Sequence, residues 1–457
     1  MLARVAGRAG KHIITKRLVH TIALTPTATG IDKWNKLVDS DQRHDVRHTI
    51  INSTPFPTYT PMLYTGPVPE FDSFADWDGD PDNCSDSEYA NFYTSLGKLS
   101  QLPRMDSVCL RFTENCAAED DVYGNRHEPP SHRFEIFEQF FQVLAQRRQT
   151  PGALPVRTLT IYNLQNMPSP QITSSTPFTS VMRDVQHLHL HIREEWNEHG
   201  PDQDIEREER RTFMPFLRDH WLAPIASQLK SLTISFPDCW GPLPGYFCGH
   251  GLHFPKLENL VLGRYCLAHG DSMDWVLRQE SLKSLRLHNC MIASHLRVHR
   301  DWMSEWQVKK HDWTRLPSAA FGFEPEIDET YHYPGKWEDV FECIGKELRK
   351  LTDFRFHIYR PRSQDEDVPF DRPDRLTTTL SPLRYVVFDQ GLLPTPWIDV
   401  DNEEGNMNFG DNDKGTPKLN RHLDTIQEDG AALDALCATV FERRQAEGYI
   451  RHSDIYD

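Results

Sequence analysis

The stretch that decides the fold is Leu282-Lys283-Ser284-Leu285-Arg286-Leu287-His288-Asn289-Cys290-Met291-Ile292. It reads apolar, two residues, apolar, one residue, apolar, and it continues into the cysteine form of the leucine-rich pattern. Leu285 and Leu287 are two residues apart, so both point to one side of a short strand. We expect Cys290 to turn inward and satisfy backbone groups in the bend, which makes it a structural thiol rather than a reactive one.

The same phrase recurs along the chain. Stacked copies would build a parallel sheet whose continuous apolar interior no single copy could bury alone. The further copies are Val46/Thr49/Ile51, Met105/Val108/Leu110, Val156/Leu159/Ile161, Val185/Leu188/Leu190, Leu229/Leu232/Ile234, Leu257/Leu260/Leu262, Leu351/Phe354/Phe356 and Leu383/Val386/Phe388.

The segments between the copies vary in length and contain helical patterns. The copies lie about 25 to about 70 residues apart, whereas a regular array keeps to roughly 20–29. Apolar residues spaced for one helix face occur over residues 131–148 and from Trp337 to Ile344. We therefore predict an α/β fold, an irregular leucine-rich-repeat-like solenoid with a parallel sheet and outer helices.

Composition divides the chain into four parts. Residues 1–24 form a basic N-terminal segment, and residues 25–398 form the leucine-rich-repeat-like domain with an acidic loop at 70–88. Residues 399–418 read as a second acidic loop, solvated by its own charge, and residues 419–457 as a C-terminal helical tail. Neither loop fits the spacing of a calcium-binding EF-hand, and we expect no cofactor.

The charge and the cysteine content limit which classes of partner and which cellular compartment we expect. The 457 residues carry 50 basic and 67 acidic side chains, a net charge of −17, which argues against a nucleic-acid partner. Nine cysteines without a C-x-x-C pair favour a reducing compartment, cytoplasmic or nuclear. No apolar run is long enough to cross a bilayer, so we expect no membrane partner. Basic residues without acidic ones before Asp32 imitate a mitochondrial transit peptide, which is the alternative.

Motifs for catalysis are missing from the sequence, so we predict a protein that is not an enzyme. The nucleophile elbow, the phosphate loop, the H-E-x-x-H pair and the dinucleotide glycine pattern are all absent. His187, His189 and His191 alternate with apolar residues, so on a strand all three would face away from the core. Such a trio can ligate zinc if a further ligand comes from elsewhere, and a metal-dependent enzyme using it is one alternative.

The outward side of the strands would be the concave partner-binding surface of a solenoid. We expect a protein substrate there. The candidate partner-binding residues are His187, His189, His191, Arg286, His288 and Arg355.

The chain resembles fungal F-box proteins with divergent leucine-rich-repeat-like regions, from about residue 12 to about residue 445. The resemblance implies the substrate receptor of a cullin-type ubiquitin ligase, whose F-box docks on a Skp-type adaptor while the repeats hold the substrate. The segments that carry it are 18–24, 34–38 and 44–48 at the join between F-box and repeats, 257–262, 274–277 and 282–287 in the centre, and 348–356 and 383–388 near the end.

The F-box itself departs from this pattern. The family's Leu-Pro-x-Glu-like signature would precede Leu18, and no residue there matches it. We expect the adaptor-binding part either to lie upstream of this sequence or to be lost from this member, and a Skp-type adaptor is a partner only in the first case. An orphan leucine-rich-repeat scaffold unrelated to ubiquitin is the other alternative.

Overall fold

The recurring phrase forms a strand at every copy, as predicted. The second and third positions of all nine phrases are buried. The strands are β2 (His48–Asn52), β3 (Ser107–Arg111), β4 (Thr158–Gln165), β5 (His187–Arg193), β6 (Ser231–Trp240), β7 (Asn259–Leu267), β8 (Ser284–His288), β12 (Asp353–His357) and β13 (Tyr385–Asp389).

The computed structural model describes residues 20–54, 86–113, 116, 128–194, 208–243, 245–317, 328–358, 378–389, 398–401, 406–409 and 422–448. It is an α/β protein with mixed, mostly parallel sheet structure. The chain divides into two units, Met1–Gln165 with Ser169–Trp196 and Asn166–Pro168 with Asn197–Asp457. Among the described residues, no helix is long and apolar enough to span a bilayer.

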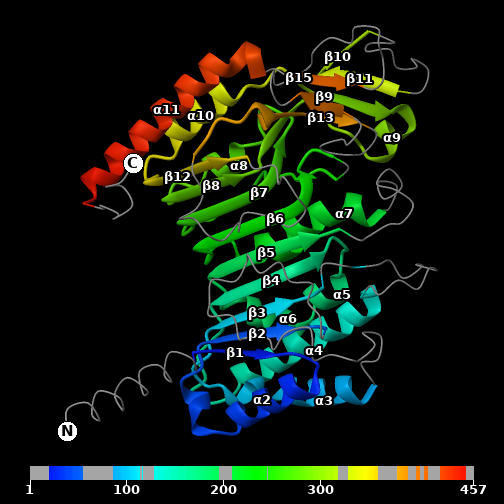
Figure 1. Cartoon of the computed structure of the whole chain (residues 1–457), viewed down its shortest axis with the longest axis vertical. Helices are drawn as coiled ribbons and strands as arrows, with labels where there is room; N and C mark the ends of the chain where they lie inside the picture. Colours follow the sequence, from blue (N-terminus) through cyan, green and yellow to red (C-terminus); the bar gives the residue numbers. More distant parts are fainter. Residues whose placement is uncertain are drawn as a thin grey trace. The chain divides into compact units, whose positions relative to one another are not determined.

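The first unit has a parallel sheet in chain order. β1 (Thr21–Leu24) pairs with β2, and β3, β4 and β5 follow side by side (Figure 1). The strands are in register, so Thr21, His48, Ser107, Thr158 and His187 form one rung across the sheet. The connecting helices are α2 (Ala28–Val38), α3 (Asp86–Gly97), α4 (Pro130–Arg148), α5 (Pro170–Thr173) and α6 (Thr176–Met182), with short 3-10 turns at Asp41–His44 and Lys98–Gln101.

Helix α4 supplies much of the apolar contact in this unit. Its Phe137 ring stacks on Phe112 just after β3, with centroids 5.3 Å apart, and Phe141 meets Phe178 of α6 at 4.8 Å. The predicted amphipathic helix over residues 131–148 is therefore confirmed, and its apolar side is the buried one.

The second unit begins with parallel strands and then becomes mixed. β6, β7, β8 and β12 pair in parallel. β9 (Met291–His299) pairs in parallel with the end of β7 and with β13, and antiparallel with β11 (Asp328–His332). β10 (Thr314–Arg315) joins β11 antiparallel. The expectation of a purely parallel sheet is wrong here.

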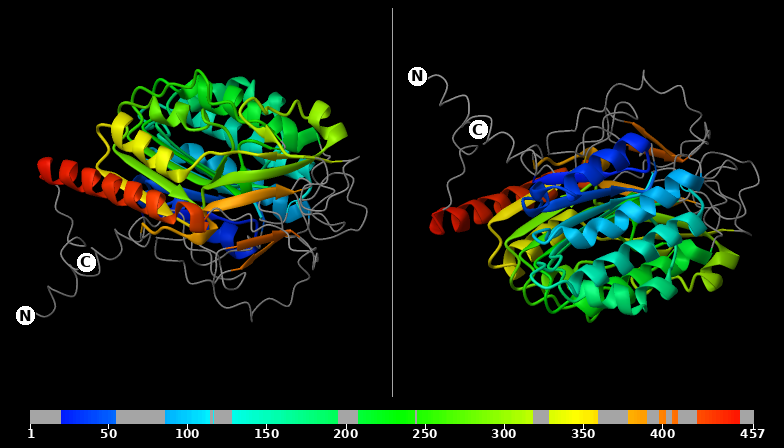
Figure 2. Two further views of the ribbon diagram at one scale, coloured as in Figure 1. Left: turned by 90° about the horizontal axis from the view of Figure 1, so that it is seen from above. Right: turned by 90° about the horizontal axis from the view of Figure 1, so that it is seen from below.

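Helices in the second unit are α7 (Glu208–Phe216), α8 (Asp274–Leu277), α9 (Arg300–Glu305), α10 (Trp337–Glu347) and α11 (His422–Ala446). A π-helix follows α7 at Leu217–Leu222, and short 3-10 turns lie at Ala223–Ile225 and Pro382–Arg384. Figure 2 shows α11 beside α10. Arg443 of α11 donates to the Gly345 and Leu348 carbonyls at 2.7 and 2.9 Å, which closes the C-terminal end of α10.

Parts of the predicted acidic loops are regular structure. β14 (Ile398–Asp401) and β15 (Asn406–Phe409) form an antiparallel hairpin inside the segment expected to be a loop at 399–418. Residues 86–88 of the other loop begin α3. The loop prediction is wrong for these residues, while 70–85, 402–405 and 410–418 lie outside the described part. Residues 1–19, with the transit-peptide alternative, lie outside it too.

Candidate functional site

The polar face of the first unit carries the three candidate histidines of β5. His187, His189 and His191 are half-buried, whereas the alternating Leu188 and Leu190 are buried. The faces are therefore those predicted from the alternation.

An aromatic and cationic group continues from these histidines across the sheet. The His191 ring stacks on Tyr162 of β4 with centroids 4.4 Å apart and planes 13° apart. The Arg111 guanidinium lies 5.3 Å from the centre of the same Tyr162 ring. Arg111, Tyr162 and His191 thus present flat, ordered side chains in a row, an arrangement that suits contact with another protein.

Burial keeps His189 and His191 neutral at pH 7. It lowers the pKa of His189 to about 4, with a further contribution from His187. It lowers the pKa of His191 to about 3, aided by His189 and Arg111. At neutral pH the strand therefore offers uncharged imidazoles that can both donate and accept hydrogen bonds.

The β5 histidines do not converge as metal ligands would. Residues two apart on one strand lie about 6.5–7 Å apart. Within the described ranges, the ligand atoms that come close enough to hold a cation belong to His269, His311 and Asp312. The metal alternative for the trio gains no support from this geometry.

The second unit has a polar face built the same way. Arg286 on β8 is the register partner of Arg355 on β12, and His288 is the partner of His357. The two histidine rings lie nearly parallel, 6.0 Å apart and 11° between planes. Burial, with His357 and Arg264 nearby, lowers the pKa of His288 to about 3, so this ring is neutral as well.

Asp353 organises the cations on this face. Its carboxylate accepts from Ser284 Oγ at 2.7 Å and lies 3.1 Å from Arg286 Nη2. Arg355 Nε is 3.6 Å away, and Arg444 of α11 reaches the same group at 3.2 Å. Burial pushes the pKa of Asp353 up, but the hydrogen bond from Ser284 and the arginines outweigh it and hold the pKa below its usual range.

The six predicted residues therefore fall into two groups. His187, His189 and His191 lie on the first unit, and Arg286, His288 and Arg355 lie on the second, each group on the polar side of its strands. Cys290 is buried with its Sγ 3.3 Å from the Leu262 carbonyl, as expected of a thiol that satisfies backbone in the bend. The described cysteines are all free.

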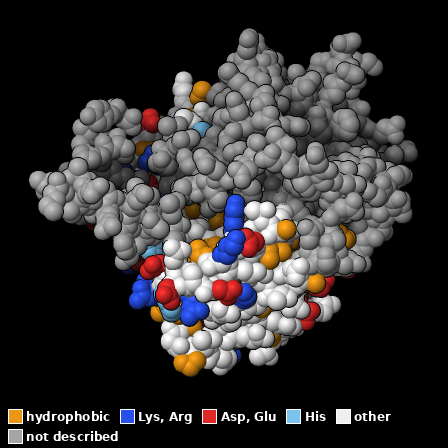
Figure 3. All heavy atoms as spheres, turned by 60° about the horizontal axis from the view of Figure 1, so that its bottom comes forward, with side chains coloured by type: hydrophobic (Ala, Val, Ile, Leu, Met, Phe, Trp, Pro, Cys, Tyr) orange, Lys and Arg blue, Asp and Glu red, His pale blue; other side chains and the backbone are white. Residues whose placement is uncertain are grey.

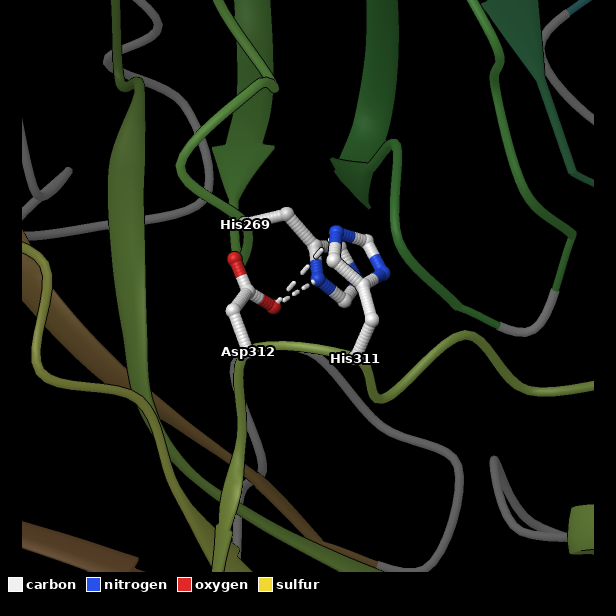
Figure 4. Close-up of side chains that lie close together, drawn as sticks. All are labelled: His269, His311 and Asp312. Atoms are coloured by element: carbon white, nitrogen blue, oxygen red, sulfur yellow. Dashed lines mark hydrogen bonds and ion pairs between the residues drawn. The ribbon is translucent and has the colours of Figure 1, made fainter.

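A compact polar cluster lies elsewhere in the second unit. His269 follows β7, and His311 and Asp312 stand between α9 and β10 (Figure 4). His269 Nδ1 is 2.5 Å from Asp312 Oδ1, and His311 Nε2 is 3.9 Å from the same oxygen. The Asp312 Oδ2 accepts the Gly270 N–H at 2.7 Å. The carboxylate is thereby oriented from both sides.

Aromatic rings hold His269 in place. Trp313 and His311 lie parallel to it, with centroids 4.9 and 4.7 Å away and planes 8° and 10° apart. Burial lowers the pKa of His269, and the neighbouring Asp312 offsets this only in part. For Asp312 the Gly270 hydrogen bond and His269 outweigh burial and lower its pKa. A neutral imidazole and an ionised carboxylate result.

Sequence reasoning did not find this cluster. The adjacent residues His311, Asp312 and Trp313 are the local signal for this cluster. That signal is weak, because neighbouring polar residues are common in loops. His269 lies 43 residues before Asp312, and nothing in the spacing indicates that they meet. A pocket adjoins His269, with Tyr246, Tyr265, Asp271 and Trp275 among its lining residues.

Comparison with known proteins gives no assignment: no protein-family model matches this chain, and no curated protein is similar to it.

Proposed function

We propose that this chain is a non-catalytic receptor that binds a protein through the polar faces of its parallel strands. In this proposal the repeated phrase builds leucine-rich-repeat-like solenoid structure in each unit. The observation that carries it is the alternation of burial on strands held in register. On β5, β8 and β12 the apolar residues of one side fill the core, and the register aligns the polar residues of the other side into rungs.

The second unit supplies the most detailed support. Across β6, β7, β8 and β12 the register aligns Ser231, Asn259, Ser284 and Asp353 in one rung. The next rung ends in Arg286 and Arg355, and the one after it in His288 and His357. This face therefore has a carboxylate in its first rung, two arginines in its middle rung and imidazoles in its last rung, which suits a partner with complementary polar groups.

The arginines of this face are ordered before any partner arrives. The side chains of Arg286 and Arg355 are 15% and 25% exposed, and both contact Asp353. A side chain that is already held loses less conformational entropy on binding. Arginine is also a residue type that interfaces favour.

The surface charge fits a protein partner better than a nucleic acid. In the view of Figure 3, the coloured Lys and Arg side chains stand next to Asp and Glu. With a net charge of −17 for the whole chain, counterion release from a phosphate backbone would contribute little to binding.

The resemblance to F-box proteins makes a ubiquitylation target the favoured partner. The test is affinity capture of the endogenous protein with mass spectrometry of bait and partners. A Skp-type adaptor and a cullin among the partners would support the ligase-receptor role. Capture of other proteins without the adaptor and the cullin would favour the orphan repeat scaffold. The receptor role would then depend on showing that a captured protein contacts the polar strand face.

Variants separate surface binding from general damage. Arg355→Ala and His288→Ala should weaken capture of the partner while the unfolding midpoint stays close to that of the wild type. Arg349→Ala is the matched control, since Arg349 is exposed just after α10. If all three variants captured the same amount of partner, the assignment of this face as the binding surface would be wrong.

A further inference from the structure

We propose that His269, His311 and Asp312 bind a divalent transition-metal cation of the zinc type, at a site separate from the proposed receptor face. Two imidazole nitrogens and one carboxylate oxygen form the donor set that such cations take in sites with three protein ligands. The three ligand atoms lie within 4.8 Å of one another. They come from two chain segments that the fold brings together (Figure 4).

The spacing of the ligand atoms is close to what a tetrahedral site needs. Zinc bonds of about 2.0–2.1 Å place neighbouring ligand atoms about 3.3 Å apart. The 2.5 Å between His269 Nδ1 and Asp312 Oδ1 is shorter because the two atoms share a hydrogen bond. The 3.9 Å from His311 Nε2 to the same oxygen is longer. A cation replacing the shared proton therefore requires His269 Nδ1 and Asp312 Oδ1 to separate by about 0.8 Å, and it requires the His311 ring to turn toward the same point.

Two of the ligands are held before the cation arrives. The His269 side chain is 1% exposed, and Asp312 is fixed by the Gly270 N–H at 2.7 Å. The backbone N–H of His269 donates to Ser272 Oγ at 3.1 Å, which sets the loop after β7. The Gly270 N–H bound to Asp312 is an outer partner of the kind that orients a metal ligand and raises affinity.

The third ligand is free to adjust. A metal bound by imidazole lies in the ring plane, so the present parallel stacking of His311 on His269 has to give way to a tilt of one ring. The His311 side chain is 56% exposed, so its rotation displaces little. The same exposure gives a cation access from solvent, and three protein ligands leave a fourth position open.

The test is a titration of the chelator-stripped full chain with Zn²⁺ by calorimetry, repeated with Co²⁺ and its visible absorption. We expect one equivalent to bind. Co²⁺ should show d–d bands of a low-coordinate site without a sulfur-to-metal charge-transfer band, because no thiolate belongs to the set. His311→Ala should weaken Zn²⁺ binding at least about tenfold.

Matched variants make the result decisive. His253→Ala is the control, because His253 is also an exposed histidine of this unit and should bind Zn²⁺ like the wild type. Asp312→Asn should also bind more weakly. If it fails to fold by circular dichroism, His311→Ala alone decides. Equal affinity of His311→Ala and His253→Ala, a thiolate band with Co²⁺, or no binding at micromolar Zn²⁺ would each overturn the site.

Discussion

Arg384 Nε lies 2.7 Å from Asp429 Oδ2, and both side chains are completely buried. The hydroxyls of Tyr385 and Thr425 donate to the same carboxylate oxygen at 2.8 Å each. The other oxygen accepts the Glu338 N–H at 2.8 Å, at the start of α10. One carboxylate therefore joins β13, α10 and α11.

Replacing Asp429 with alanine should destabilise the second unit by about 3–5 kcal/mol, because the buried guanidinium of Arg384 loses this carboxylate partner. Urea unfolding followed by tryptophan fluorescence measures the loss. The control is Asp434→Ala on the exposed side of the same helix, which should change stability by less than about 0.5 kcal/mol. Similar losses in both variants would refute the central role of this carboxylate.

Arg147 and Arg148 are neighbours with opposite roles. Arg147 is 1% exposed and donates to the carbonyls of Leu102, Met105 and Leu154 at distances from 2.5 to 3.0 Å. Arg147→Met should cost about 3 kcal/mol or more, because several buried carbonyls lose their donor.

Arg148→Met serves as the matched control, because its side chain is 38% exposed and pairs with Asp184 at the surface. A surface ion pair contributes about 1 kcal/mol at most. The two variants are compared in the same chemical denaturation series. Equal destabilisation would mean that the carbonyl contacts of Arg147 do not stabilise the first unit.

The predicted strands are those that carry the repeated apolar phrase, and some of them have one buried and one polar face. On β8, Leu285 and Leu287 are buried while Arg286 and His288 are half-buried, and this alternation is legible in the residues. β9 was not predicted, and all of its residues except His299 are buried. Residues 295–299 do alternate between polar and apolar, but the polar His295 and Arg297 are buried too, so the alternation does not tell which side faces the core.

The candidate sites divide in the same way. The direction of His189 or Arg355 follows from strand alternation alone. The partners of these side chains do not follow from the alternation, because the partner residues come from distant segments of the chain. Asp353 meets Arg286 across 67 residues and Arg444 across 91. His269 and Asp312 meet only because β7 and the segment before β10 end close together.

Gly241 occupies a backbone conformation that a side chain would strain. Its φ is +128°, and a Cβ there would lie 2.9 Å from the Cys266 carbonyl and 2.9 Å from the Tyr265 ring. Gly241→Ala should therefore cost about 2 kcal/mol or more. Gly97→Ala is the control: Gly97 has φ −55° with open space around it, so stability should rise by up to about 1 kcal/mol. Thermal unfolding of both variants gives the comparison, and a neutral Gly241→Ala would contradict the strained geometry.

The β5 histidines should make stability fall in acid. In the folded chain the pKa values of His189 and His191 are about 4 and about 3, against about 6.5 when unfolded. Between these values the unfolded chain binds more protons, so the free energy of unfolding decreases as pH falls from 6.5 toward 4. The double variant His189→Gln/His191→Gln should remove most of that decrease, which is about 5 kcal/mol at most for the two rings together. Urea unfolding at a series of pH values measures it, with exposed His253→Gln as the control. The same pH slope in wild type and double variant would show that these rings titrate normally in the folded chain.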